Sequence, residues 1–248
     1  MANIIWDQES YRHYDTGVKN LVFAYERSTE SPTSGSDAEA KPWVGVTAIN
    51  ESPSGAEETK LYADDDQYFT MYSPESYACT IEAYQFPDAF YKALGVVTNN
   101  TAAFEFQPHK RFNIAYITTV GNDVEGIDFG RRLHIVYNLY AKLSAENNST
   151  INDSPEAMTF SFECESLPIA YNGYEDISTI TIDEKVLNSE GNWELNPKFT
   201  AVMGMVYGTD ANTEANPPVA EIRPFIPEPS VLLTNSTNDP APVEDDTP

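Results

Sequence analysis

The chain has 248 residues, of which 41% are apolar and 12% aromatic, so it is long enough to bury a core as one large β domain or two small ones. Its 39 acidic side chains outnumber the 14 lysines and arginines, which leaves a formal net charge of −25. Tight DNA binding is therefore not expected, because nucleic-acid binders concentrate basic side chains that displace counterions from phosphates. A highly soluble or salt-adapted surface is a second explanation for the charge.

The cellular setting is indicated by what the sequence lacks. Met1 to Asp15 contains no basic segment followed by an apolar run, and the chain has no apolar stretch of 18 residues. We therefore expect neither a secretion signal nor insertion into a membrane. Cys79 and Cys164 form no Cys-x-x-Cys pair, and we interpret them as small apolar residues in a reducing compartment.

The first third of the chain predicts strands separated by long loops. Strands are predicted at residues 17–25, 43–49 and 77–84, where β-branched and aromatic residues or a period of two fit a pleated sheet. Residues 28–41 are rich in Ser, Thr, Gly and Glu and are predicted as a flexible loop. Residues 51–67 are also predicted as a loop, although hairpin connections usually span only about 2 to 5 residues. A loop of that length is usually functional or disordered.

The middle of the chain predicts further strands at residues 111–118, 131–143 and 158–165. The clearest alternation is in the second of these. One face of that strand is predicted to hold Leu133, Ile135, Tyr137, Leu139 and Ala141. The opposite face is predicted to hold Arg132, His134, Asn138 and Lys142. In the third strand, Met158, Phe160, Phe162 and Cys164 alternate with polar residues. These strands favour a mainly β, largely antiparallel architecture.

Two short helices are predicted to flank the sheet. The first follows Pro87, with Phe90 and Leu94 four residues apart and Gly95 as its end. The second begins at Asn196, which is a suitable N-cap, with Pro197 in the first turn. Its apolar face is predicted to comprise Phe199, Val202, Met203 and Val206, ahead of Gly208.

The composition changes after Asp210. Eight of the 17 prolines lie between Pro217 and Pro248, and residues 234–248 carry acidic side chains without basic ones. Such a segment has too few apolar residues to form a core of its own. We therefore predict a β domain at residues 1–210 and a Pro-rich, acidic C-terminal arm at residues 211–248 that docks elsewhere and ends loosely.

No motif in the sequence indicates catalysis, a cofactor or a metal. Asp64, Asp65 and Asp66 are adjacent carboxylates, but they lack the spacing of an EF-hand loop and are better explained as an exposed turn. His134 lies on the polar face of a predicted strand and is interpreted as a sheet-surface residue. Nucleophile-elbow, dinucleotide-binding, P-loop and zinc-protease motifs are missing. We expect a protein that is not an enzyme, and an acid-based hydrolase is a weak alternative.

Four stretches within residues 43–166 follow one another in a specific order. The first is Glu51-Ser52-Pro53-Ser54-Gly55-Ala56-Glu57 with Leu61-Tyr62-Ala63-Asp64, and the second is Thr80-Ile81-Glu82-Ala83-Tyr84. The third is Gly121-Asn122-Asp123 with Leu133-His134-Ile135-Val136-Tyr137, and the fourth is Thr150-Ile151-Asn152-Asp153-Ser154-Pro155-Glu156-Ala157 with Phe160-Ser161-Phe162-Glu163. Together they resemble the major tail protein family of siphophages that infect Gram-positive and related bacteria.

The resemblance implies a structural virion protein with a tail-tube fold. That fold is a β-sandwich or half-barrel with one or two short flanking helices and extended terminal arms. Its subunits form hexameric rings that stack into a hollow tube, through which double-stranded DNA passes without specific binding. The implied partners are other copies of the chain and the tape-measure, tail-terminator and tail-tip proteins. The implied locations are the virion tail and, during assembly, the cytoplasm of the bacterial host.

The predicted loop at residues 51–67 is our candidate for ring-to-ring contacts, together with the terminal arms. Its candidate assembly residues are Ser54, Gly55, Glu57, Glu58, Tyr62, Asp64 and Asp65. The alternative is a soluble β-sandwich that binds carbohydrate or a cell surface through exposed aromatics among the 15 tyrosines and three tryptophans.

Overall fold

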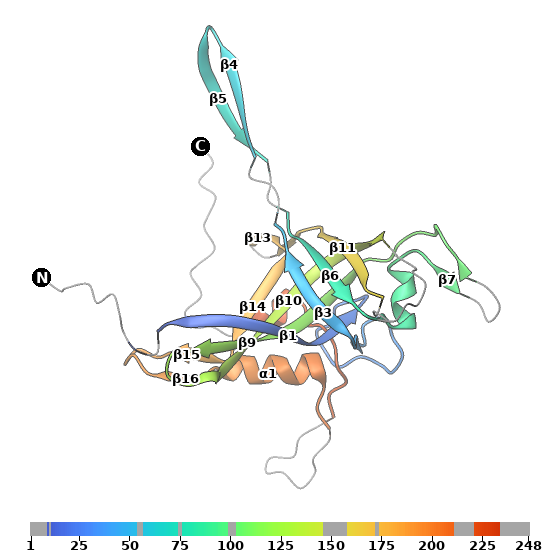
Figure 1. The fold of residues 1–248 in the computed structure, drawn as a ribbon, viewed down its shortest axis with the longest axis vertical. Coiled ribbons are helices and arrows are strands. Elements are labelled where there is room, and N and C mark those ends of the chain that lie inside the picture. Colours follow the sequence, from blue (N-terminus) through green and yellow to red (C-terminus); the bar gives the residue numbers. More distant parts are fainter. Residues whose placement is uncertain are drawn as a thin grey trace, which may run out of the picture.

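The computed structural model describes residues 9, 11–53, 57–73, 76–98, 103–145, 158–171, 174–210 and 221–233. Its fold is mainly antiparallel β, as the sequence predicts, with short helices beside the sheets (Figure 1). All six predicted strands are present, with ends shifted by a few residues.

The main sheet has the strand order β2-β1-β9-β10-β11-β6-β3, and β14 pairs with β10 beside this path. Its strands are β1 (His13–Ala24), β2 (Lys41–Pro42), β3 (Val46–Glu51), β6 (Ala78–Ala83), β9 (Phe112–Asn122), β10 (Gly126–Ala145), β11 (Phe160–Ser166) and β14 (Thr179–Asp183). The sheet curls until its two ends approach each other. Strand β2 pairs with β1 at one end, and the chain then runs directly from β2 into β3, which pairs with β6 at the other end. At this point the Trp43 amide donates to the Leu21 carbonyl at 2.8 Å. The result is the predicted half-barrel.

Two-stranded ribbons and short helices complete the described fold. The ribbons are β4 (Glu58–Ala63) with β5 (Asp66–Tyr72), β7 (Val97–Thr98) with β8 (Ala103–Phe104), β12 (Ile169–Tyr171) with β13 (Tyr174–Ile177), and β15 (Lys185–Leu187) with β16 (Trp193–Leu195). The helices are the 3₁₀ helix η1 (Asp88–Lys92), α1 (Pro197–Tyr207) and α2 (Pro229–Leu233). Among the described residues, no helix is long and apolar enough to cross a membrane.

Strand β10 differs from its predicted pattern. Leu133, Ile135 and Tyr137 pack in one core, whereas Leu139 and Ala141 pack in the other. The prediction of one continuous apolar face is therefore wrong. Asn138 has a φ of 55°, and the register with β9 shifts between Val136 and Leu139. This irregularity is a β-bulge, which inserts an extra residue and moves the following side chains to the opposite face.

The first core fills the inside of the curled sheet and is dominated by aromatic rings. Phe90 on η1 is fully buried at its centre. Its ring centroid lies 4.4 Å from that of Trp43, 5.4 Å from Phe23 and 5.0 Å from Phe112. Tilted and edge-to-face contacts at such distances are favourable for aromatic pairs. A short helix in the predicted place thus joins β1, β9 and the segment before β3.

The second core lies on the opposite face of the sheet, beneath α1. Phe199, Val202 and Val206 of α1 are buried there, and Met203 packs against them, which confirms the predicted helix and its apolar face. Asn196 caps the helix as predicted, since its side-chain oxygen accepts a hydrogen bond from the Lys198 amide at 3.0 Å.

Removal of this cap gives a first prediction. Asn196→Ala is expected to lower the free energy of unfolding by about 1 kcal/mol, because one amide of the first turn loses its acceptor. Asn196→Ser retains a capping oxygen and should lose less. Urea unfolding of the two variants measures the difference, and equal losses would show that the cap contributes nothing.

The C-terminal segment departs from the predicted domain boundary. Phe225, Ile226 and Leu232 are buried, and the last two belong to the second core. Residues 221–233 are therefore part of the β domain and not of a separate arm. Their apolar side chains complete the core on the α1 side of the sheet, a contact that local composition does not reveal. Residues 211–220 and 234–248 of the predicted arm lie outside the described residues.

The segment at residues 28–41 was predicted as a flexible loop, but the structure ties it to the body. Ser28 and Glu39 form isolated bridges with Pro227 and Phe225. The Asp37 carboxylate accepts from Lys110 Nζ at 2.6 Å and from Lys92 Nζ at 3.1 Å. These long-range contacts are invisible to a composition-based prediction.

The ion pairs of Asp37 predict a dependence of stability on pH. The hydrogen bond from Lys110, reinforced by Lys92, holds the pKa of Asp37 below its ordinary value of 3.8. A carboxyl with a lowered pKa stabilises the fold above its unfolded-state pKa, and the stabilisation is lost as pH falls through the folded-state pKa. The melting temperature of Asp37→Asn should therefore lie below that of the wild type at pH 7, and the gap should close in acid.

Glu163→Gln is the matched control, because its pair with Lys142 is exposed and 3.8 Å long. Exposed pairs contribute little to stability, so this variant should melt close to the wild type at each pH. A gap for Asp37→Asn that does not change with pH would contradict the prediction.

Candidate assembly surface

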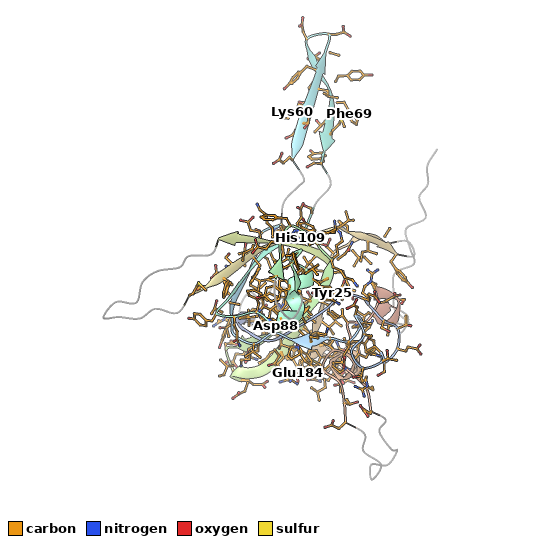
Figure 2. All side chains as sticks on the ribbon, turned by 90° about the vertical axis from the view of Figure 1, so that its right-hand side faces the viewer. Tyr25, Lys60, Phe69, Asp88, His109 and Glu184 are labelled. Carbon is orange, nitrogen blue, oxygen red and sulfur yellow. The ribbon has the colours of Figure 1, made fainter. Side chains whose placement is uncertain are left out.

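The segment at residues 51–67 was predicted as a loop, and the structure corrects this prediction. Strand β4 and the start of β5 lie within it and form a hairpin that projects away from the body (Figures 1 and 2). The turn consists of Asp64 and Asp65, with φ values of 53° and 68°. Two left-handed residues between paired strands are typical of the tight hairpin turn, and aspartate tolerates this conformation. The prediction missed the hairpin because neither turn residue is a glycine.

One face of the hairpin is apolar. Leu61 lies opposite Phe69, and Thr59 lies opposite Met71, so these side chains share a face. Leu61, Phe69 and Met71 are 45%, 57% and 51% exposed. The described part of the chain leaves this face largely uncovered. An isolated two-stranded hairpin is at best marginally stable in water, and large exposed apolar faces are typical of surfaces that contact other molecules.

The opposite face of the hairpin is mixed. It holds Tyr62 and Tyr72, together with Glu58 and Lys60, which form an ion pair at 3.2 Å. Tyr68 is the additional residue at the register shift and is 78% exposed. Uncovered aromatic side chains thus lie on both sides of one projecting element.

The predicted assembly residues are only partly the residues that form this surface. Glu57, Glu58, Tyr62, Asp64 and Asp65 lie on the hairpin, whereas Ser54 and Gly55 lie outside the described residues. Sequence reasoning missed the apolar face itself, formed by Leu61, Phe69 and Met71. The signal that was present is a period of two on both sides of the aspartate run, in Thr59, Leu61 and Ala63 and in Phe69 and Met71.

The main sheet also has open edges among the described strands. Strand β3 pairs only with β6, and β14 pairs only with β10. Strand β1 pairs with β9 along its length, but on its other side only Val22 and Phe23 pair with β2. Its pairing is interrupted near Gly17 and Asn20, which have positive φ angles. Bulges of this kind restrict an edge to a partner that matches its shape.

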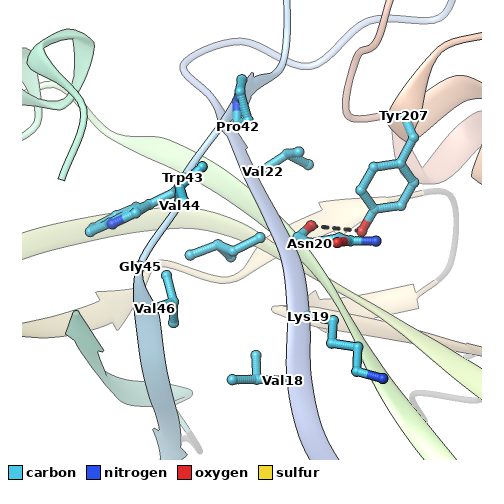
Figure 3. Close-up of a pocket in the computed structure, with 11 residues that line it drawn as sticks. Val18, Lys19, Asn20, Val22, Pro42, Trp43, Val44, Gly45, Val46 and Tyr207 are labelled. Carbon is cyan, nitrogen blue, oxygen red and sulfur yellow. Dashed lines mark hydrogen bonds between the residues drawn. The ribbon is translucent and has the colours of Figure 1, made fainter. Parts of the chain in front are cut away.

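An apolar groove of about 360 Å³ lies where the two ends of the sheet meet (Figure 3). Its walls come from residues 18–22 of β1 and residues 42–46, which lead from β2 into β3, with Tyr207 of α1. The Tyr207 hydroxyl donates to the Asn20 carbonyl at 2.9 Å. This hydrogen bond joins α1 to the edge of β1 beside the groove.

His134 and Tyr116, two side chains of types that can take part in catalysis, are engaged in packing. His134 stacks on Tyr116 with a centroid distance of 4.7 Å, and its Nε2 lies 3.0 Å from the Thr118 hydroxyl. Burial lowers the pKa of His134. Tyr116 donates from its hydroxyl to Glu51 Oε1 at 2.5 Å, at the base of the hairpin. In the part of the chain that the structure describes, no three His, Cys, Asp or Glu side chains are placed to hold a metal ion.

Several basic side chains are paired with carboxylates. Arg131 Nη2 lies 2.7 Å from Glu184 Oε1, and Lys185 Nζ lies 2.8 Å from Glu125 Oε2. Arg132 bridges Asp15 and Asp183. These pairs neutralise cations that would otherwise attract phosphate, while the acidic excess of the chain persists.

No protein-family model matches the chain, and no curated protein matches its sequence significantly. Its function is therefore inferred from the sequence motifs and from the surfaces described above.

Proposed function

We propose that this chain is the major tail protein of a siphophage, a structural subunit that assembles into stacked hexameric rings and forms the tail tube. The observation that carries the proposal is the β4–β5 hairpin, whose apolar face projects from a body with open sheet edges (Figure 2). A monomer with such features exposes surfaces that are costly in water. The four sequence stretches that resemble the tail-protein family give the same function.

The open edges support ring formation. Edge strands carry unpaired amide and carbonyl groups, which neighbouring subunits satisfy when their sheets join into one closed barrel. Six copies would then pair through edges such as those of β1, β3 and β14. Ring-to-ring contacts are head to tail, so stacking extends into a tube instead of closing.

The charge of the chain supports passage of DNA. An excess of carboxylates on the tube wall repels the phosphates of double-stranded DNA, so the duplex slides through a screened, water-filled lumen. A basic wall would bind DNA through the release of counterions. The net charge of −25 and the paired cations favour the repelling wall. In this proposal the subunit assembles in the bacterial cytoplasm, meets the tape-measure, tail-terminator and tail-tip proteins there, and resides in the virion tail.

The test is the association state of the purified protein. Sedimentation velocity over a range of concentrations should show rings or longer polymers, and negative-stain electron micrographs should show hollow tubes. A chain that stays monomeric at every concentration, and that is missing from intact virions, would overturn the proposal.

A carbohydrate-binding module is the second candidate, favoured by the exposed Tyr62, Tyr68 and Tyr72 on the hairpin. Flat aromatic rings offer apolar faces against which a sugar ring can pack. Calorimetric titration with oligosaccharides separates the two candidates. Sugar binding that is lost in Tyr68→Ala, by a chain that does not polymerise, would favour the binding module.

A further inference from the structure

The hairpin and the groove between β1 and β3 lie at opposite ends of one strand. The groove is lined by Gly45 and Val46, where β3 begins, and the hairpin follows Glu51, where β3 ends. At about 3.3 Å per residue, this strand separates them by roughly 17–20 Å. The hairpin also points away from the body (Figure 1). A copy of the chain therefore does not fill its own groove with its own hairpin.

The groove and the apolar hairpin face are chemically alike. The groove wall includes Val18, Val22 and Val44, with the buried Trp43 beside them (Figure 3). Val44 is 67% exposed, although valine gains by leaving water. A volume of about 360 Å³ admits side chains such as Leu61 and Phe69, since pockets of roughly 300–1,000 Å³ hold whole small molecules.

The hairpin tip and the groove also carry opposite charges. The hairpin tip carries Asp64, Asp65 and Asp66, all exposed. Lys19 lines the groove and Lys41 precedes its Pro42, and neither lysine has an ion-pair partner among the described residues. Copies of a chain with a net charge of −25 repel each other over most of their surface. An apolar groove with Lys19 in its wall and Lys41 next to it in the chain is therefore a favourable place for an acidic tip to dock.

We propose that the β4–β5 hairpin of one copy docks, through Leu61, Phe69 and Met71, into the β1–β3 groove of a second copy, with its aspartate tip near Lys19. This inference rests on the proposed self-assembly and identifies which two surfaces meet. The six residues of β4 span about 20 Å, which is comparable to the separation along β3. Because hairpin and groove are different surfaces, the contact is heterologous and repeats from copy to copy.

Intermolecular cross-linking tests the contact directly. Phe69→Cys and Val44→Cys are made in separate full-length chains, because both positions are exposed and tolerate substitution. The two proteins are mixed, assembled and treated with oxidised glutathione, which takes up two electrons and two protons as the two thiols join in one disulfide. A non-reducing gel should show a covalent dimer in the mixture and little in either protein alone.

Two controls define the background. The wild type should give no dimer, because Cys79 and Cys164 are buried. Phe69→Cys mixed with Val124→Cys should also give little, because Val124 is similarly exposed but lies in the turn between β9 and β10.

In a second measurement, Val44→Asp should require at least a tenfold higher concentration to polymerise, with an unchanged melting temperature, because a carboxylate replaces an apolar contact beside an acidic tip.

The outcomes separate the docking contact from the function. A Phe69–Val44 cross-link between copies supports the contact. Tubes that form without this cross-link, and that tolerate Val44→Asp, overturn the docking contact and leave the tail-tube function standing. A chain that neither polymerises nor cross-links overturns both.

Discussion

Replacing residues 58–72 by two glycines is expected to leave a folded protein that does not form the proposed tubes. The hairpin contributes no side chain to either core, so the body should retain its structure. Glu57 and Ser73, which the deletion retains, are joined by a backbone hydrogen bond of 3.1 Å, so two residues suffice to bridge them. The deletion removes Leu61, Phe69 and Met71, which are about half exposed, so burial of each in a contact stabilises it by about 1 kcal/mol. Their sum corresponds to on the order of a hundredfold in the concentration needed for polymerisation.

Circular dichroism and sedimentation velocity measure the two parts of this prediction. The melting temperature should stay within a few degrees of the wild type, while the sedimenting species becomes a single ring or a monomer. Lys60→Gln is a suitable control, because it retains the hairpin and its apolar face. Tubes of normal length from the deletion variant would show that the hairpin takes no part in stacking.

Phe90→Ala is expected to cause the largest loss of stability, about 3–5 kcal/mol, because a fully buried ring is replaced by a cavity. The ring contacts Phe23, Trp43, Phe112 and Phe162, which come from four separate parts of the chain. Since small domains are stable by only about 5–15 kcal/mol, the variant should lie close to the limit of folding. The midpoint of urea unfolding measures the loss.

Phe106→Ala is the matched control, because Phe106 is 95% exposed. Substitutions at such positions usually change the free energy of unfolding by less than about 0.5 kcal/mol. A similar shift for Phe90→Ala and Phe106→Ala would contradict the central place of Phe90 in the first core.

In the proposed assembly, the parts of the fold that determine stability differ from the parts that determine polymerisation. The two cores lie on the two faces of the curled sheet, and they hold the described body together without the hairpin. In the proposed assembly, the hairpin, the open strand edges and the groove are the surfaces that contact other copies. Variants of the hairpin should therefore alter polymerisation with little effect on unfolding, whereas variants of Phe90 should do the reverse. Measuring both properties on the same variants tests this division.

Part of the candidate site could be predicted, because it depends on the length and residue pattern of one continuous segment. The length of the segment at residues 51–67 predicts a functional loop, and Tyr62, Asp64 and Asp65 do lie on the projecting hairpin. The apolar partners in β5 were missed, since an Asp-Asp turn resembles an exposed charged loop. The groove could not be predicted, because residues 18–22, residues 42–46 and Tyr207 meet only when the sheet curls.

The sequence by itself determined the class of the fold, six strands of the main sheet, and helix α1 with its cap. These features depend on neighbours in the chain, such as alternating apolar residues or Asn196 followed by Pro197. Only the tertiary structure decided that the bulge at Asn138 divides β10 between two cores and that residues 221–233 complete one of them. The reason is physical: a register shift and a long-range contact depend on the partner strand, and local sequence does not specify that partner.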